Sequence, residues 1–288
     1  MNFLKKIQIY WDYIEKKYPK PKYVKNIIKI DIDELKSEIN KKNFSFIKKV
    51  IRNLHKDSSV IILGNAAPKD LKKTIFDLVN TYENKKPTFY KMFNGVKNFY
   101  RIIDKKVAYK YSTYAIKQSY YFFNWNCKSK TQRKFQSDVY NFWRYTKLLA
   151  GISKRKYEKN IPSDNKIDRI QIVKYPKGGG EIKDHIDNVK NLRVTSGLVM
   201  SKKGVDFKSG GIYFRDKKNK KVFVENKIND GDAVIFCGSI VHGVSKVDPK
   251  KRINWKSKNA RWYVGMFVED SDYVKNRNTA TNVDIANY

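Results

Sequence analysis

Cysteine, histidine and long apolar runs are scarce in this chain of 288 residues. Its only cysteines, Cys127 and Cys237, are too few for a disulfide framework or a zinc knuckle. No apolar run approaches the roughly 18 residues that a membrane span requires. The first residues also lack the continuous apolar stretch of a secretory signal. These absences lead us to expect a protein without a membrane span that works in the reducing cytoplasm.

Acidic residues are few relative to basic ones, since 62 Lys and Arg stand against 28 Asp and Glu, a formal charge of +34. Lys is spread over every segment and forms no recognition motif. A solvated coat is therefore the favoured interpretation, and nucleic acid is an open but less favoured partner. A hydrophobic fraction of 41% is sufficient for a buried core and excludes a wholly disordered chain.

The spacing of apolar residues changes near residue 160. Before it, helical periodicity predicts helices at 3–18, 33–55, 71–82 and 132–149, with a strand at 60–63 and an ambiguous aromatic stretch at 98–126. After it, alternation and turn signals predict an antiparallel sandwich or barrel with strands at 169–175, 192–200, 211–215, 221–225, 233–237, 241–247 and 261–268. We therefore expect an α+β fold in one compact unit, with a mainly helical N-terminal lobe (1–160) and a β core (161–288).

Histidine, with three copies, gives the most informative pattern. His185 and Asp187 are two residues apart, so in extended backbone their side chains point to one face. His242, on a different expected strand, would complete a set of two imidazoles and one carboxylate. Such a set leaves coordination positions open and suits non-haem Fe(II). His55 lies among charged residues of the helical half and is interpreted as a surface histidine.

The order of short motifs around these residues resembles the iron(II)/2-oxoglutarate-dependent dioxygenase superfamily. The resemblance covers about residues 168–268, and its matching pieces are Tyr175, Gly178-Gly179, His185-x-Asp187, Gly210-Gly211, Gly231-Asp232, His242-Gly243-Val244 and a downstream Arg. It implies a double-stranded β-helix, a jelly-roll or cupin-like core. It further implies Fe(II) bound by His185, Asp187 and His242, 2-oxoglutarate and O₂ as cosubstrates, and ascorbate as a candidate reductant.

In this family the downstream Arg pairs with the distal carboxylate of 2-oxoglutarate, and the chain offers two candidates. Arg261 opens an apolar strand, where a buried guanidinium needs an anionic partner. Arg252 has the commoner spacing after His242 but lies among residues typical of a solvated loop. We favour Arg261 and keep Arg252 as the alternative. Tyr175 is either a hydrogen-bond donor to the same cosubstrate or an ordinary core aromatic residue.

The activity that the resemblance implies is hydroxylation of an unactivated C–H bond, with release of succinate and CO₂. Halogenating relatives have Ala or Gly in place of Asp187, so this carboxylate argues against halogenation. Loops expected at the mouth of the site are rich in Lys and aromatic residues, which favours an anionic small-molecule or biosynthetic substrate. Two alternatives stay open: a protein or nucleic-acid hydroxylase or demethylase of the same superfamily, and a non-catalytic cupin-like module that binds nucleic acid. The oligomeric state cannot be inferred.

Overall fold

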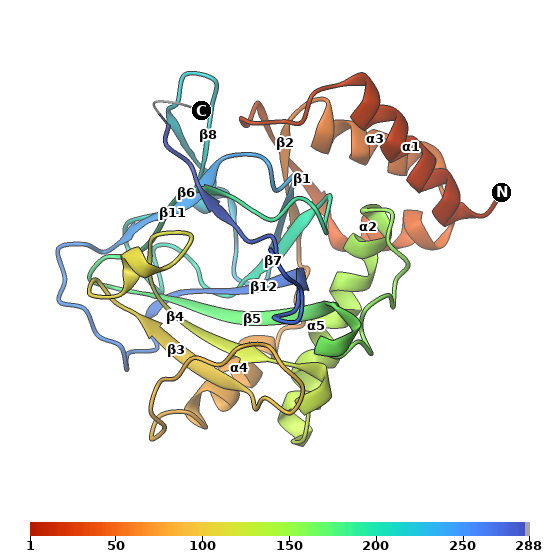
Figure 1. Cartoon of the computed structure of the whole chain (residues 1–288). Helices are drawn as coiled ribbons and strands as arrows, with labels where there is room; N and C mark the ends of the chain where they lie inside the picture. Colours follow the sequence, from red (N-terminus) through yellow and green to blue (C-terminus); the bar gives the residue numbers. More distant parts are fainter. Residues whose placement is uncertain (286–288) are drawn as a thin grey trace.

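A computed structural model describes residues 1–285 of the chain (Figure 1). The α-helices within these residues are α1 (Phe3–Lys17), α2 (Ile32–Asn40), α3 (Phe44–His55), α4 (Leu71–Asn80) and α5 (Lys130–Leu149). The strands are β1 (Asn26–Asp31), β2 (Ser59–Gly64), β3 (Phe99–Ile103), β4 (Ala115–Phe122), β5 (Lys166–Pro176), β6 (Gly180–Ile186), β7 (Thr195–Val199), β8 (Gly211–Arg215), β9 (Lys221–Phe223), β10 (Ala233–Phe236), β11 (His242–Val247), β12 (Ala260–Asp270) and β13 (Thr281–Asn282). No helix in this part of the chain combines the length and the apolar character needed to cross a bilayer.

The strands form two layers that share one strand. The first layer has the order β1-β2-β10-β7-β12-β5-β4-β3, and the second has the order β4-β6-β11-β8-β9, with β13 beside β6. β4 belongs to both layers, because residues 118–122 pair with β5 whereas residues 115–116 pair with β6. Apart from β1 and β2, which run parallel, the paired strands are antiparallel. This arrangement is the double-stranded β-helix expected from the sequence.

Strands predicted for the second half of the chain are confirmed to within a few residues, and β8 matches its predicted bounds. The exception is β6, where no strand was predicted. This strand is polar because it contains Glu181, Lys183 and Asp184. Its outward residues alternate with buried ones such as Ile182. So short an apolar pattern does not distinguish a strand from a loop.

Two helices replace the single helix predicted at 33–55. The break comes at Lys42, whose φ of 56° lies in the left-handed region that a helix cannot continue through. Asn43 then caps α3, because its side-chain oxygen accepts a hydrogen bond from the N–H of Phe46 at 3.2 Å. Within the periodic stretch, Lys42 therefore ends one helix, and the capping residue Asn43 starts the next.

Strands from the first half of the chain extend the first layer at both edges. β2 pairs with β10 on one side, and β4 pairs with β5 on the other. In Figure 1, α1, α2 and α3 gather near β1 and β2, while α4 and α5 lie near β4 and β5. Because β4 also forms part of the second layer, the first half of the chain helps to build the interior. The domain boundary at residue 160 stays a prediction.

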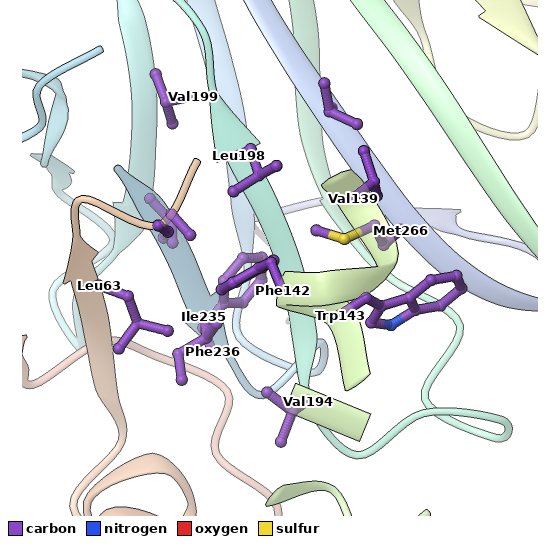
Figure 2. Close-up of a cluster of buried hydrophobic side chains, with 14 of the residues drawn as sticks. Leu63, Val139, Phe142, Trp143, Val194, Leu198, Val199, Ile235, Phe236 and Met266 are labelled. Atoms are coloured by element: carbon purple, nitrogen blue, oxygen red, sulfur yellow. The ribbon is translucent and has the colours of Figure 1, made fainter. Parts of the chain in front are cut away.

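Helix α5 buries its apolar face against the first layer (Figure 2). Phe142 and Trp143 of α5 are at most 1% exposed and lie near Leu198 of β7 and Met266 of β12. Neighbouring residues on a strand point to opposite faces. Leu198 and Met266 therefore face the helix, and the residues that alternate with them face the interior between the layers.

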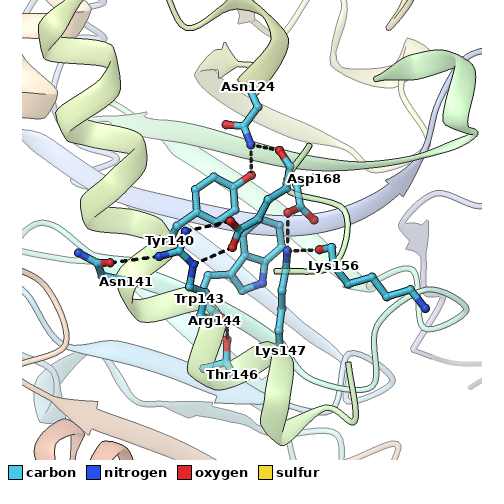
Figure 3. A network of polar contacts seen from close by, with 10 residues as sticks. Asn124, Tyr140, Asn141, Trp143, Arg144, Thr146, Lys147, Lys156 and Asp168 are labelled. Carbon is cyan, nitrogen blue, oxygen red and sulfur yellow. Dashed lines mark hydrogen bonds and ion pairs between the residues drawn. The ribbon is translucent and has the colours of Figure 1, made fainter. Parts of the chain in front are cut away.

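A buried ion pair joins the same helix to the start of β5 (Figure 3). The Lys147 ammonium contacts the Asp168 carboxylate, and both side chains are almost fully buried. Lys147 also donates to the carbonyl oxygen of Lys156 at 2.7 Å and lies 4.2 Å from the centre of a Trp143 ring. Desolvation raises the pKa of Asp168 to about 6, against the opposing charge of Lys147.

We expect Lys147→Met to lower the free energy of unfolding by about 3–5 kcal/mol, because it leaves the Asp168 carboxylate buried without its cation. The double variant Lys147→Met/Asp168→Leu should recover most of this loss, since neither charge then remains. Urea unfolding followed by tryptophan fluorescence measures both values. A single variant as stable as the wild type would contradict this assignment.

Candidate metal centre and adjoining cavity

Three side chains from separate stretches of the chain meet between the two layers. His185 lies near the end of β6, Asp187 follows that strand, and His242 opens β11 directly opposite His185. Nε2 of His185 is 3.8 Å from Oδ1 of Asp187, and Nε2 of His242 is 3.7 Å from Oδ2. The ligand atoms of all three residues lie within 4.8 Å of one another. They converge on one point, as the ligands of a single ion do.

Backbone hydrogen bonds orient both imidazoles with Nε2 toward the carboxylate. Nδ1 of His185 lies 2.8 Å from the carbonyl oxygen of Lys183, and Nδ1 of His242 lies 2.9 Å from that of Ile240. A carbonyl oxygen only accepts, so each Nδ1 carries the proton and each Nε2 keeps a lone pair. This is the tautomer that a metal ligand needs, with the outer nitrogen fixed by the backbone.

Burial keeps the His185 ring neutral. Desolvation, reinforced by His242, lowers the pKa of His185 to about 3. The centres of the two imidazole rings are 4.2 Å apart, so two protonated rings would repel each other. A neutral His185 beside the Asp187 carboxylate and the His242 ring forms part of a ligand set that is suited to a cation.

Two hydrogen bonds fix the position of Asp187. The backbone N–H of Asp187 donates to the carbonyl oxygen of Gly238 at 2.9 Å, and the Thr195 hydroxyl donates to Oδ2 of Asp187 at 2.9 Å. Thr195 belongs to β7 in the first layer, whereas His185 and His242 belong to the second. The carboxylate is therefore positioned by contacts from both layers.

Thr195→Val should weaken metal binding about 10- to 100-fold, the usual range when a hydrogen bond behind a ligand is lost. The variant keeps the shape of the side chain and removes only the hydroxyl. Thr146→Val is the matched control, because this buried Thr of α5 bonds to Ser196 and lies away from the ligands. Competitive titration against a chelator measures the metal affinity. Equal affinities for the wild type and Thr195→Val would show that the hydroxyl does not orient Asp187.

The three ligands line a cavity of about 530 Å³ between the layers, a volume typical of small-molecule sites. Alternate residues of each strand face it. β5 contributes Arg169, Gln171, Val173 and Tyr175, and β12 contributes Arg261, Tyr263, Phe267 and Glu269. Residues from β6, β8, β10 and β11 also line it, among them Ile182, Ile212, Phe236 and Val244, and β3 and β4 contribute further residues.

Arg261, on the cavity wall, is 1% exposed, and not all of its hydrogen-bond donors have partners. Its Nε donates to both carboxylate oxygens of Glu225 at 3.0 Å. Its Nη2 is also buried and has no hydrogen-bond partner among residues 1–285. Buried donors are nearly always paired in folded proteins. The unused donor of Arg261 therefore points to a missing acceptor.

Gly211 explains how Glu225 reaches Arg261. Its φ of 113° lies in the region that favours glycine, and a Cβ built there would lie 2.6 Å from the Cγ of Glu225. The next N–H, that of Ile212, donates to Glu225 at 2.6 Å. The Gly-Gly motif thus makes room for the acid that orients the guanidinium.

Two phenols flank the Arg261 guanidinium. Tyr175 is the cross-strand partner of Arg261, and the centres of the Tyr175 and Tyr263 rings lie 5.6 and 5.9 Å from the guanidinium carbon. Burial raises the pKa of both hydroxyls, so both stay protonated at neutral pH. Each hydroxyl can therefore donate a hydrogen bond.

The remaining residues singled out in the sequence lie elsewhere. Arg252 is exposed and is not among the residues that line the cavity. The interpretation of His55 as a surface residue is wrong, because the side chain is 3% exposed. Its Nε2 lies 3.1 Å from the carbonyl oxygen of Tyr18, and its ring packs edge-on against Trp11. His55 follows Ile51 by four residues, which places it on the apolar face of α3.

Sequence reasoning missed four charged residues of the site. Glu225 was assigned to the end of a strand, and Arg169 to the start of one, without a role. Arg101 of β3 and Lys117 of β4 lie in the stretch 98–126 that the sequence left ambiguous. Assigning that stretch to two strands would have placed alternate residues, such as Arg101 and Ile103, on one face.

Comparisons with known proteins identify the fold. No protein-family model matches the chain, and no curated protein matches its sequence. The crystal structure of the full-length thymine-7-hydroxylase from Neurospora crassa in complex with alpha-KG is similar, with a TM-score of 0.51 and 12% identity over 89% of this chain and 88% of that chain. Also similar are a Pseudomonas putida prolyl-4-hydroxylase (TM-score 0.46, 11% identity, 73% and 91% covered) and a 2OG-Fe(II) oxygenase family oxidoreductase from Burkholderia pseudomallei (0.40, 12%, 82% and 93%). At this identity the likeness to the Neurospora crassa enzyme shows a shared fold.

Proposed function

We propose that this chain is an Fe(II)/2-oxoglutarate-dependent oxygenase. His185, Asp187 and His242 bind the iron, and Arg261 anchors the distal carboxylate of 2-oxoglutarate. One observation carries the proposal: two imidazoles and a carboxylate converge in a cavity that also contains a buried Arg with an unused donor. The fold shared with the Neurospora crassa enzyme supports it.

The donor set fits Fe(II). Two imidazoles and one carboxylate on one side of the ion are the ligands of non-haem iron oxygenases. No further His, Cys, Asp or Glu of residues 1–285 joins the three. The protein therefore fills one face of the ion and leaves the cavity side for exogenous ligands.

The cavity also fits 2-oxoglutarate. A carboxylate is the acceptor that the free Nη2 of Arg261 lacks, and a guanidinium binds it through charge-assisted hydrogen bonds. Tyr175, beside Arg261, supplies a protonated hydroxyl. Arg252 is exposed and is not among the residues that line the cavity, so we propose Arg261 as the anchor.

Iron, 2-oxoglutarate and O₂ together supply an oxidant that attacks an unactivated C–H bond, with release of succinate and CO₂. The residues of this chain hold the iron and 2-oxoglutarate, orient the groups that bind them and shield the site from water. His185 and His242 present lone pairs, Thr195 fixes Asp187, and Glu225 fixes Arg261. Apolar side chains on the wall, including Ile182, Phe236 and Val244, keep water from the open face. Because Asp187 is present, we propose hydroxylation as the reaction rather than halogenation.

We further propose a small-molecule substrate. The cavity of about 530 Å³ has the volume of a small-molecule site and must hold 2-oxoglutarate as well. The residues that line it come from strands of both layers, from residues 110–113 and from the segment 277–280.

Conversion of 2-oxoglutarate to succinate tests the proposal, since oxygenases of this kind turn over slowly without their prime substrate. We expect succinate to form only when Fe(II), 2-oxoglutarate and O₂ are all present, and to stop when a chelator is added. Binding of nucleic acid that is unaffected by His185→Ala, together with the absence of succinate, would favour the non-catalytic alternative.

A further inference from the structure

The cavity holds more positive charge than the proposed reaction uses. Arg101 of β3, Lys117 of β4 and Arg169 of β5 all line it. β4 lies between β3 and β5, so these cations come from three adjacent strands. They are separate from Arg261, which is already paired with Glu225.

Arg101 is held by aromatic rings and by no acid. Its guanidinium carbon lies 5.2 Å from the ring centre of Phe89, 4.8 Å from that of Tyr111 and 4.9 Å from that of Tyr121. Its Nε is buried without a hydrogen-bond partner among residues 1–285. The three rings fix the orientation of the guanidinium and leave its donors unused.

Lys117 lies where β4 passes from one layer to the other, between the residues that pair with β6 and those that pair with β5. Burial, followed by the charges of Arg101 and Arg169, lowers the pKa of Lys117 to about 7. The acid that favours its charged form is the ligand Asp187. An ammonium group in such surroundings lacks the counter-ion that buried charges normally have.

Arg169 is the one cation of the three with an acidic partner in the described chain. Its Nη2 lies 2.9 Å from Glu269, while its Nε is buried and unpaired. Glu269 therefore offsets Arg169, whereas no ion pair joins Arg101 or Lys117 to an acid of residues 1–285. A group with two negative charges can contact both of these side chains, whereas a single carboxylate offers one charge to the two.

We propose that Arg101 and Lys117, helped by the free Nε–H of Arg169, bind a dianionic phosphate monoester on the prime substrate. This inference rests on the proposed function, because the phosphate monoester is taken to be part of the substrate of the oxygenase. A phosphate monoester carries close to two charges at neutral pH and several acceptor oxygens. Arg binds such a group through its planar fork, and Lys binds it as a point charge. The substrate would thus be anchored by its phosphate.

Calorimetric titration with inorganic phosphate tests this site on the anaerobic protein loaded with Fe(II) and 2-oxoglutarate, and again on the metal-free protein. We expect the phosphate Kd to rise at least about tenfold in Lys117→Met and in Arg101→Met. Lys117→Arg keeps the charge and should stay within about threefold of the wild type. Lys105→Met, an exposed residue outside the cavity, is the matched control and should change nothing. Acetate, with one charge, should bind the wild type more weakly than phosphate.

Phosphate that fails to bind the wild type at millimolar concentration, or that binds both Met variants as well as the wild type, would overturn the proposal. So would a rise in the Kd of 2-oxoglutarate, rather than of phosphate, in Lys117→Met, since the cluster would then belong to the cosubstrate site. Failure of the oxygenase assignment has a different signature. The metal-free protein would still bind phosphate through these residues, but Fe(II) and 2-oxoglutarate would not bind.

Discussion

Asp187→Ala should reduce iron-dependent succinate formation about a thousandfold or more, because the variant removes the one anionic ligand and leaves two neutral imidazoles to hold a dication. Fe(II) affinity should fall with it. Asp187 directly follows β6, and its side chain contacts Thr195 and the two His, so the fold should survive the substitution. Succinate formation and Fe(II) binding are measured on the same preparation, with circular dichroism to confirm folding.

The matched control for this variant is Glu181→Gln. Glu181 is a carboxylate on β6, the strand before Asp187, but is not among the residues that line the cavity. Its substitution should leave both iron binding and turnover within about twofold of the wild type. A folded Asp187→Ala protein that still binds Fe(II) and forms succinate at the wild-type rate would exclude Asp187 as a ligand.

Arg261→Lys should raise the Kd of 2-oxoglutarate about tenfold or more, since Lys keeps the charge but loses the planar fork and the free Nη2. Removing the charge altogether should raise the Kd of 2-oxoglutarate about a hundredfold or more. For this purpose the double variant Arg261→Met/Glu225→Gln is suitable, because it leaves no unpaired carboxylate in the interior. Anaerobic titration of 2-oxoglutarate into the Fe(II) protein measures these values.

Arg252→Met is the matched control for the cosubstrate anchor, because Arg252 was the alternative and is exposed. It should bind 2-oxoglutarate like the wild type. The reverse outcome, a large loss in Arg252→Met and none in the Arg261 variants, would move the anchor to the loop before β12.

The three residues of the candidate metal centre could be singled out from the sequence because their signal is local. With only three His in the chain, a His and an Asp two residues apart already share one face of an extended segment. The strands of the second half could be predicted for the same reason, since alternation and turn residues act over a few positions. The distance from His185 to His242 along the chain did not matter, because His185 and Asp187 come after the predicted strand 169–175 and His242 lies in the predicted strand 241–247.

Residues whose role depends on pairing across strands could not be predicted in this way. Glu225 reaches Arg261 only because Gly211 of β8 leaves space for it. Arg101 and Lys117 reach the cavity because β3 and β4 extend the first layer, and these strands lie in an aromatic stretch with no clear period. His55 was misjudged from its charged neighbours, although its spacing from Ile51 places it on the buried face of α3.

The most direct measurement is an anaerobic crystal structure with Fe(II) and 2-oxoglutarate, with iron located by its anomalous scattering. The account predicts one iron peak bonded to Nε2 of His185, Nε2 of His242 and the Asp187 carboxylate, with the distal carboxylate of 2-oxoglutarate on Arg261. Iron at another position, or no iron between these three side chains at saturating Fe(II), would contradict it.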